Sequence, residues 1–210
     1  MSFAKDRGRA RLGAAFMIAG GLLVLFALSL FLYNDAEDRR ASASATRIAD
    51  ALEARIETRI EADAGGAVYA RDPAKTISVD GETYIGLLRI PALELSLPVM
   101  REWNYRKLKI SPCRYSGSTE EDTMVIAAHN YRRHFGSIRL LSRGSAVYFT
   151  DADGNTNSYA VAAVETLEAT DIEGMTSSGY ALTLFTCTYG GAARVAVRCD
   201  RVESLSETGI

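Results

Sequence analysis

The sequence predicts a mainly β domain, an antiparallel barrel or sandwich, preceded by one membrane-spanning helix and a polar spacer. Three observations support this prediction. Short apolar runs separated by turn residues recur from about residue 83 onward, which is typical of many short strands. One long apolar run lies near the N-terminus, and a charged stretch without Pro or Gly follows it. The chain has 210 residues, enough for one domain of ordinary size and an attachment segment.

The composition argues against two broad classes of protein. Hydrophobic residues make up 48% of the chain and charged residues 24%, a balance that excludes wholesale disorder. The net charge of -2 gives no reason to expect a nucleic-acid partner. Residues 1–33 hold four basic residues and one acidic residue, a charge of +3, which leaves -5 on the rest of the chain. A basic N-terminal segment therefore precedes a mildly acidic remainder.

The first element is an apolar run of 22 residues without a charge, residues 12–33. At a rise of about 1.5 Å per residue, it spans the roughly 30 Å hydrocarbon core of a bilayer. A cleaved signal peptide has a shorter apolar core and a cleavage site of small residues, whereas this run ends in Leu-Phe-Leu-Tyr. We therefore expect an uncleaved anchor. The basic segment 1–11 should stay in the cytoplasm, which places everything after residue 33 outside the cell membrane.

A polar spacer is expected over residues 34–80. Its apolar residues Ile48, Leu52, Ile56 and Ile60 fall four apart, which is helical spacing along one narrow stripe. Two interpretations stay open. The segment is a helix that packs its stripe on the domain or holds the domain away from the membrane, or it is a partly helical, solvated spacer.

The domain itself is expected to span residues 81–210. Its apolar runs contain β-branched residues or alternate with period two, and they cover 84–90, 94–100, 123–129, 145–150, 158–167, 181–186 and 194–199. Turn residues, such as those of the segment 151–155, separate these runs. Short helices are expected at 136–144 and at about 171–178. Many short strands with few helical stretches favour the barrel or sandwich.

Three cysteines stand at positions 113, 187 and 199. An odd count without C-x-x-C spacing argues against a zinc ribbon and against a dense disulfide framework. A bridge between Cys113 and Cys199 is one alternative. We expect instead three free thiols, with only Cys187 exposed and reactive.

Cys187 lies where a hairpin could place it beside a cation. It ends an apolar strand, six residues with a Gly-Gly pair follow, and Arg194 begins the next apolar run. Symmetric pairing about that loop puts Cys187 opposite Arg194, with Cβ atoms roughly 5 Å apart. A guanidinium there favours a thiolate and can donate hydrogen bonds to an oxyanion. The alternatives are a buried structural thiol beside a surface arginine, and Arg198 as the functional cation, since it shares a strand face with Arg194.

His129 is the candidate proton carrier. It ends the apolar run 124–129, where a strand meets a polar loop. A cysteine nucleophile needs a proton acceptor for the thiol and a proton donor for the leaving amine, and imidazole does both near neutral pH. The alternative is a structural histidine. The other histidine, His134, lies in a basic, loop-like stretch and is expected to be less firmly positioned.

Together these segments resemble the sortase family over roughly residues 83–202. The run Thr183-Leu-Phe-Thr-Cys187 followed by Arg194 is similar to the TLxTC…R signature, and 125–129 is similar to the catalytic-histidine strand. Residues 85–91 and 95–99 resemble the opening strands of the sortase barrel. The resemblance implies a closed eight-stranded β-barrel with short helices, mainly β in class.

The resemblance also implies roles for individual residues. Cys187 would be the nucleophile, His129 the general acid and base, and Arg194 the residue that binds substrate and stabilises the oxyanion. Thr186, Asn130 and Tyr189 are the candidate substrate-binding residues. The acidic calcium loop typical of class A sortases is not visible, and we expect neither a metal nor a cofactor.

The implied activity is that of a membrane-anchored cysteine transpeptidase of a Gram-positive cell surface. It would cleave the C-terminal sorting signal of a secreted protein through a thioester and pass the acyl group to an amine of a cell-wall precursor or a pilin subunit. Residues 111–117, Asn130 with Tyr131, and the segment FGSIRLL look closest to class B-like sortases. Two departures from that class are the short loop between Cys187 and Arg194 and the lack of a long extra helix between 150 and 182.

Two other functions compete with this interpretation. One is a non-catalytic, membrane-tethered β-barrel that binds a partner, with Cys187 a structural thiol. The other is a cysteine peptidase that only hydrolyses. Hydrolysis and transpeptidation share an acyl-enzyme, so the sequence does not separate them.

Overall fold

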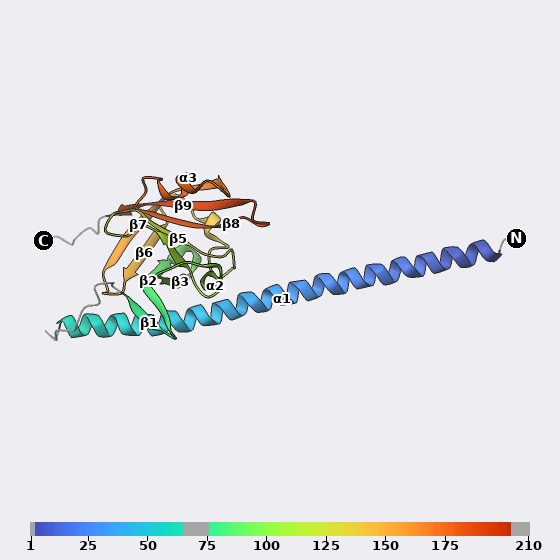
Figure 1. Ribbon diagram of the computed structural model, residues 1–210, viewed down its shortest axis with the longest axis horizontal. Helices are drawn as coiled ribbons and strands as arrows, with labels where there is room; N and C mark the ends of the chain where they lie inside the picture. Colours follow the sequence, from blue (N-terminus) through green and yellow to red (C-terminus); the bar gives the residue numbers. More distant parts are fainter. Residues whose placement is uncertain (1–2, 65–75, 203–210) are drawn as a thin grey trace. The chain divides into compact units, whose positions relative to one another are not determined.

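The computed structural model describes residues 3–64 and 76–202 (Figure 1). The chain divides into two compact units, residues 1–40 and residues 41–210. One helix, α1 (Phe3–Ala64), contributes to both units. Each unit is treated by itself below.

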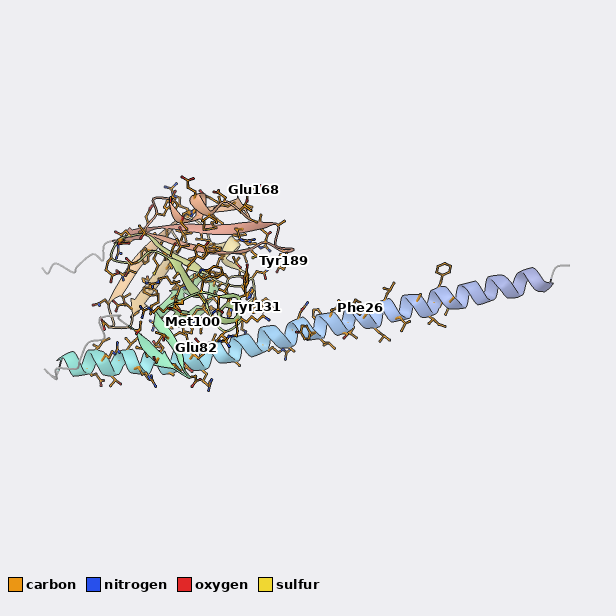
Figure 2. All side chains as sticks on the ribbon, in the orientation of Figure 1. Phe26, Glu82, Met100, Tyr131, Glu168 and Tyr189 are labelled. Carbon is orange, nitrogen blue, oxygen red and sulfur yellow. The ribbon has the colours of Figure 1, made fainter. Side chains whose placement is uncertain are left out.

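The first unit is the N-terminal part of α1. Its residues Ala15–Ala36 form the one described stretch that is long and apolar enough to cross a membrane, with a mean hydropathy of 2.5 over its most apolar window. Large apolar side chains of this stretch, such as Phe26 (labelled in Figure 2), are exposed. The stretch overlaps the apolar run expected at 12–33.

The second unit is built on nine strands and a few short helices. The strands are β1 (Ile77–Val79), β2 (Glu82–Ile90), β3 (Leu95–Met100), β4 (Cys113–Ser116), β5 (Met124–Ala127), β6 (Ala146–Asp151), β7 (Thr156–Glu168), β8 (Leu182–Cys187) and β9 (Ala193–Val202). The short helices are η1 (Pro91–Leu93), α2 (Tyr105–Leu108), η2 (Ile138–Leu140) and α3 (Ile172–Thr176). The helix expected at 136–144 is only the three-residue turn η2, and α2 was not expected.

The sheet closes into the predicted eight-stranded barrel. Its strand order is β1-β2-β3-β4-β5-β8-β9-β7-β6, and an additional pairing of β2 with β6 joins the ends. Eight strands, β2 to β9, form the ring, while β1 extends along β2. Gly86 permits the closure, because a Cβ at this position would lie 2.2 Å from the carbonyl oxygen of Thr150 on β6.

The barrel interior is filled by alternate side chains of these strands. Leu88, Ile126, Leu184 and Val197 are among the fully buried members of this core. Most neighbouring strands run antiparallel, as expected, but β3 with β4 and β5 with β8 are parallel pairs. The second of these pairs determines where the candidate site lies.

The C-terminal part of α1 packs on the outside of the barrel. Ile48, Leu52 and Ile56 are buried and contact barrel residues that include Tyr84 and Leu87. Figure 1 shows this part of the helix alongside β1 and β2. The packed helix is therefore the correct one of the two interpretations of the spacer. The stripe ends before Ile60, which is 47% exposed.

Polar contacts add to this helix packing. The Arg59 guanidinium donates hydrogen bonds to the carbonyl oxygens of Ala152 and Thr76, each 3.0 Å long. Arg47 forms an ion pair with Asp80 at 2.6 Å. These contacts fix the C-terminal part of the helix to the chain around β1 and to the turn after β6, although exposed ion pairs contribute little stability.

Removing the central side chain of this stripe should destabilise the domain. We expect Leu52→Ala to lower the free energy of unfolding by about 2–5 kcal/mol, because it leaves a cavity at a fully buried position. Urea unfolding of the full chain in detergent micelles, followed by fluorescence of the single tryptophan, Trp103, measures the loss. Glu57→Ala, on the exposed side of the same helix, is the control and should change little. Equal stability of the two variants would contradict the packing.

Candidate active site

The parallel pairing of β5 with β8 brings the ends of two chemically important strands together. Ala127 is opposite Phe185, and the Ala128 amide donates a 3.1 Å hydrogen bond to the Phe185 carbonyl. The Thr186 hydroxyl then donates a 2.8 Å bond to the Ala128 carbonyl. One residue further along each of the two segments, the same register places His129 beside Cys187.

The side chains of His129 and Cys187 lie on the outer face of the barrel. Along β8, Leu182 and Leu184 belong to the barrel core, while Phe185 packs with Val125, Met175 and other residues outside it. Side chains alternate along a strand, so Cys187 shares the outer face with Phe185. The half-buried thiol is therefore open to a ligand that approaches from outside the barrel.

The β8–β9 hairpin confirms the predicted pairing of Cys187 with Arg194. The two residues are direct cross-strand partners. The loop between them closes through a 3.0 Å bond from the Thr188 amide to the Ala193 carbonyl. Gly190 and Gly191 both have positive φ angles, 85° and 77°, which favour glycine. The loop is therefore shaped by its Gly-Gly pair.

The Arg194 guanidinium is partly held by the same loop. Its Nη1 donates hydrogen bonds of 3.0 Å to the carbonyl oxygens of Gly191 and Ala193. Within residues 3–64 and 76–202, no hydrogen-bond acceptor contacts its Nε or Nη2. The guanidinium thus keeps a fixed position next to Cys187 with donors to spare.

His129 is half-buried and rests against Tyr131, with ring centroids 5.0 Å apart. Its Nε2 is buried, and no described residue forms a hydrogen bond with it. Burial, and secondarily the charge of Lys109, lower the pKa of His129 below its ordinary value. The imidazole is therefore neutral near pH 7 and able to accept a proton.

One cavity of about 230 Å³ collects the expected catalytic residues. His129, Cys187 and Arg194 all line it, as does Thr186. An aromatic wall formed by Trp103, Tyr105, Tyr115 and Phe185 bounds one part, and Asp171, Ile172 and Met175 of the α3 segment bound another. Apolar and aromatic side chains therefore make up most of the cavity lining around the thiol.

Two expected substrate-binding residues are not part of this lining. Tyr189 is 77% exposed, and Figure 2 shows it at the tip of the β8–β9 hairpin. Asn130 follows His129 and is half-buried, but it does not border the cavity. The sequence reasoning in turn missed the aromatic wall. The close spacing of Trp103 and Tyr105 in a polar connection between strands was the available signal.

His134 was expected to be less firmly positioned than His129, and this expectation was wrong. Its side chain is fully buried, and neither ring nitrogen has a hydrogen-bond partner among the described residues. The ring lies against Tyr131, with centroids 5.5 Å apart, and does not line the cavity. Burial, with a smaller contribution from His129, lowers the pKa of His134 from 6.5 to about 4. His134 is therefore a neutral residue of the core.

The expectation of three free thiols is confirmed. Cys113 and Cys199 are fully buried, and burial raises the pKa of each thiol to about 12. Both are protonated and inaccessible, which removes them as candidate nucleophiles. Cys187 is the only cysteine at the cavity.

Comparison with known proteins agrees with this geometry. A family described as "Sortase domain" matches residues 88–202. Sortase C1 from Streptococcus suis is 26% identical with a TM-score of 0.51, over 60% of this chain and 76% of that chain. Sortase C1 from Streptococcus agalactiae is 24% identical with a TM-score of 0.52, over 60% and 72%. Sortase A from Corynebacterium diphtheriae, a lid mutant, is 21% identical with a TM-score of 0.50, over 60% and 73%. No curated protein matches the chain.

These structures carry the names sortase C and sortase A. Two of them are less than 25% identical to this chain, and their likeness supports the fold alone. The resemblance to class B-like sortases therefore stays a prediction.

The buried His134 should make stability depend on pH. Its pKa is about 4 in the folded protein and 6.5 in the unfolded chain, so the unfolded chain binds the proton more readily between these values. The free energy of unfolding should therefore be highest above pH 6.5 and fall by roughly 3 kcal/mol as the pH decreases toward 4. His134→Met should remove most of this slope.

Urea unfolding at about pH 7 and about pH 4.5 measures the effect. Arg133→Met, at the exposed neighbouring position, is the control and should keep the slope of the unmodified chain. A His134→Met variant with an unaltered slope would show that this imidazole does not set the pH dependence.

Proposed function

The chain belongs to the sortase family of cysteine transpeptidases, and we propose that Cys187, His129 and Arg194 are its catalytic residues. One observation carries this proposal: the three residues, from β8, the end of β5 and β9, line a single cavity on the outer face of the barrel. The proposed reaction cleaves a C-terminal sorting signal of a secreted protein and transfers the acyl group to an amine.

In the first half of the reaction, the Cys187 sulfur attacks the carbonyl carbon of the scissile peptide bond. Neutral His129 takes the thiol proton, which its lowered pKa allows it to do near pH 7. The negative carbonyl oxygen of the tetrahedral intermediate accepts hydrogen bonds from the Arg194 guanidinium. When the C–N bond breaks, His129 gives its proton to the leaving amine, and a thioester remains on Cys187.

In the second half, an acceptor amine attacks the thioester carbonyl. His129 accepts a proton from the attacking nitrogen, and Arg194 again stabilises the oxyanion. The C–S bond breaks, the Cys187 sulfur recovers a proton from His129, and the product leaves with a new amide bond. Water in place of the amine would give hydrolysis by the same steps. The proposed acceptor is an amine of a cell-wall precursor or of a pilin subunit.

Thr186 contributes in two ways in this proposal. Its hydroxyl ties β8 to the Ala128 carbonyl just before His129, so it helps to hold the nucleophile and the base in register. It also lines the cavity, and we assign contact with the peptide to its backbone, because the residue is only 4% exposed and its side chain alternates with that of Cys187. Asn130 and Tyr189 lie outside the cavity lining, so we assign them no contact.

The proposed location is the outer side of the cell membrane. The apolar stretch Ala15–Ala36 supports an anchor, and the basic residues before it support a cytoplasmic N-terminus. A sorting signal on a secreted protein and a cell-wall amine would then meet at the catalytic domain outside the cell.

The catalytic trio is tested by alanine substitution. We expect Cys187→Ala to abolish cleavage, and His129→Ala and Arg194→Ala to lower kcat/KM by roughly a hundredfold or more, because each removes a group acting on the reacting atoms. Fluorogenic pentapeptides incubated with the full chain in detergent, with and without an added amine, measure cleavage and transfer.

Arg143→Ala, an exposed arginine that does not line the cavity, is the charge-matched control and should retain normal turnover. Near-normal activity of Arg194→Ala would overturn its assignment. Cleavage without any amine-dependent product would identify a hydrolase instead of a transpeptidase.

The proposed topology predicts the behaviour of the chain in cells. The protein should fractionate with membranes, and its residues 76–202 should be digested by protease added to intact, wall-stripped cells. In a variant in which acidic residues replace the basic residues of 1–11, a smaller fraction of the molecules should have residues 76–202 outside the membrane. Protection of residues 76–202 in intact cells, with digestion only after lysis, would reverse the orientation.

A further inference from the structure

Arg198 is a buried arginine that the proposed chemistry does not use. It lies on β9, four residues after Arg194 and on the same strand face, yet only 2% of it is exposed. Its Nε forms an ion pair with Glu165 at 3.1 Å, and its Nη1 donates a 3.1 Å bond to the Thr183 hydroxyl. A guanidinium is rarely buried without such partners, and these bonds determine where the Arg198 side chain lies.

The other two bonds of Arg198 reach the helix α3. Nη1 donates to the Met175 carbonyl at 3.3 Å and Nη2 donates to the Gly174 carbonyl at 2.6 Å. At the opposite end, the Asp171 side chain caps the helix by accepting a 2.8 Å bond from the Gly174 amide. The guanidinium thus donates hydrogen bonds to two carbonyl groups near the C-terminal end of α3, where a positive charge is favourable.

The helix α3 needs such support. It has five residues, and a single turn does not form a stable helix by itself. Met175 is its one buried side chain and packs with Val125 and Ala196 on the outer face of the barrel. Figure 1 shows α3 over β9. Arg198 and Met175 therefore both fix α3 to the barrel.

What α3 contributes is a wall of the cavity. Ile172 and Met175 line the same cavity as Cys187, and Met175 belongs to the cluster against which Tyr115 and Phe185 of the aromatic wall pack. Ile172 is 61% exposed, so a ligand in the cavity can bury its side chain. A shift of α3 would change the width of the cavity without touching Cys187, His129 or Arg194.

We propose that Arg198 is a positioning residue that holds α3 as a specificity wall, against which an apolar side chain of the peptide packs. The inference rests on the proposed peptide cleavage. It assigns different tasks to two arginines of one strand face: Arg194 acts on the reacting carbonyl, and Arg198 acts through α3 on which peptide fits.

The test uses the full chain in detergent and two peptides that the unmodified chain cleaves, identical except for Leu or Ala at the position of strongest apolar preference. Arg198→Met keeps the bulk of the side chain and removes its bonds to α3. We expect it to raise KM for the Leu peptide and to reduce the Leu-to-Ala preference in kcat/KM by about tenfold. Arg198→Lys, which keeps the charge but not the fork of donors, should recover part of the preference.

Three further measurements separate positioning from general destabilisation. Ile172→Ala, a change to the wall itself, should lower the same preference without lowering Tm. Val147→Ala, in the barrel core away from α3, should lower Tm and leave the preference unchanged. Labelling of Cys187 by methyl methanethiosulfonate should proceed at the same rate in Arg198→Met and in the unmodified chain.

Hydrogen exchange supplies a readout that does not depend on turnover. Amides of 171–178 should exchange faster in Arg198→Met, while those of β8 stay protected. Unaltered exchange in 171–178, or an unaltered Leu-to-Ala preference, would overturn the inference. If the unmodified chain cleaves no peptide, the proposed function fails, and the exchange result still decides whether Arg198 holds α3.

Discussion

The candidate site depends on one parallel strand pair. Because β5 and β8 run in the same direction, their C-terminal ends meet at one edge of the sheet, and the bond from the Thr186 hydroxyl to the Ala128 carbonyl fixes their register there. An antiparallel pair would put the two ends at opposite edges, about 20 Å apart for a strand of six residues. The proposed base, His129, and the proposed nucleophile, Cys187, are therefore brought together by sheet topology, and the β8–β9 hairpin adds Arg194 as the direct partner of Cys187.

Residues of the same type differ in their proposed roles because they differ in burial. Arg194 and Arg198 lie four residues apart on one strand face, but the first keeps donors beside the cavity, whereas the second has its guanidinium bonded to Glu165, Thr183 and α3. The two histidines differ in the same way. His129 lines the cavity, and His134 is enclosed in the core. Residue type indicates what a side chain can do, and its surroundings decide whether it can reach a ligand.

The parts that the sequence predicted correctly are those set by short-range patterns. The pairing of Cys187 with Arg194 follows from a short Gly-Gly loop, and the packed helical stripe follows from the spacing of Ile48, Leu52 and Ile56. The parallel pairing of β5 with β8 joins segments more than fifty residues apart and leaves no local pattern; only the resemblance to a family supplied the closed barrel. His134 was misjudged because the preceding arginines suggest a loop, while the burial of its ring depends on distant residues. The burial of Arg198, in contrast, could not be predicted without knowing where α3 packs.

The distribution of the three thiols has a consequence for oxidative damage. A cysteine oxidised to the sulfenic acid is rescued most readily when a neighbouring thiol condenses with it to form a disulfide. Here both other cysteines are enclosed in the domain and fully protonated, so neither can act as a resolving thiol for Cys187. Under oxidising conditions the chain would lose its proposed nucleophile without an internal route of repair. Recovery would require a reductant or a thiol small enough to enter the cavity from outside.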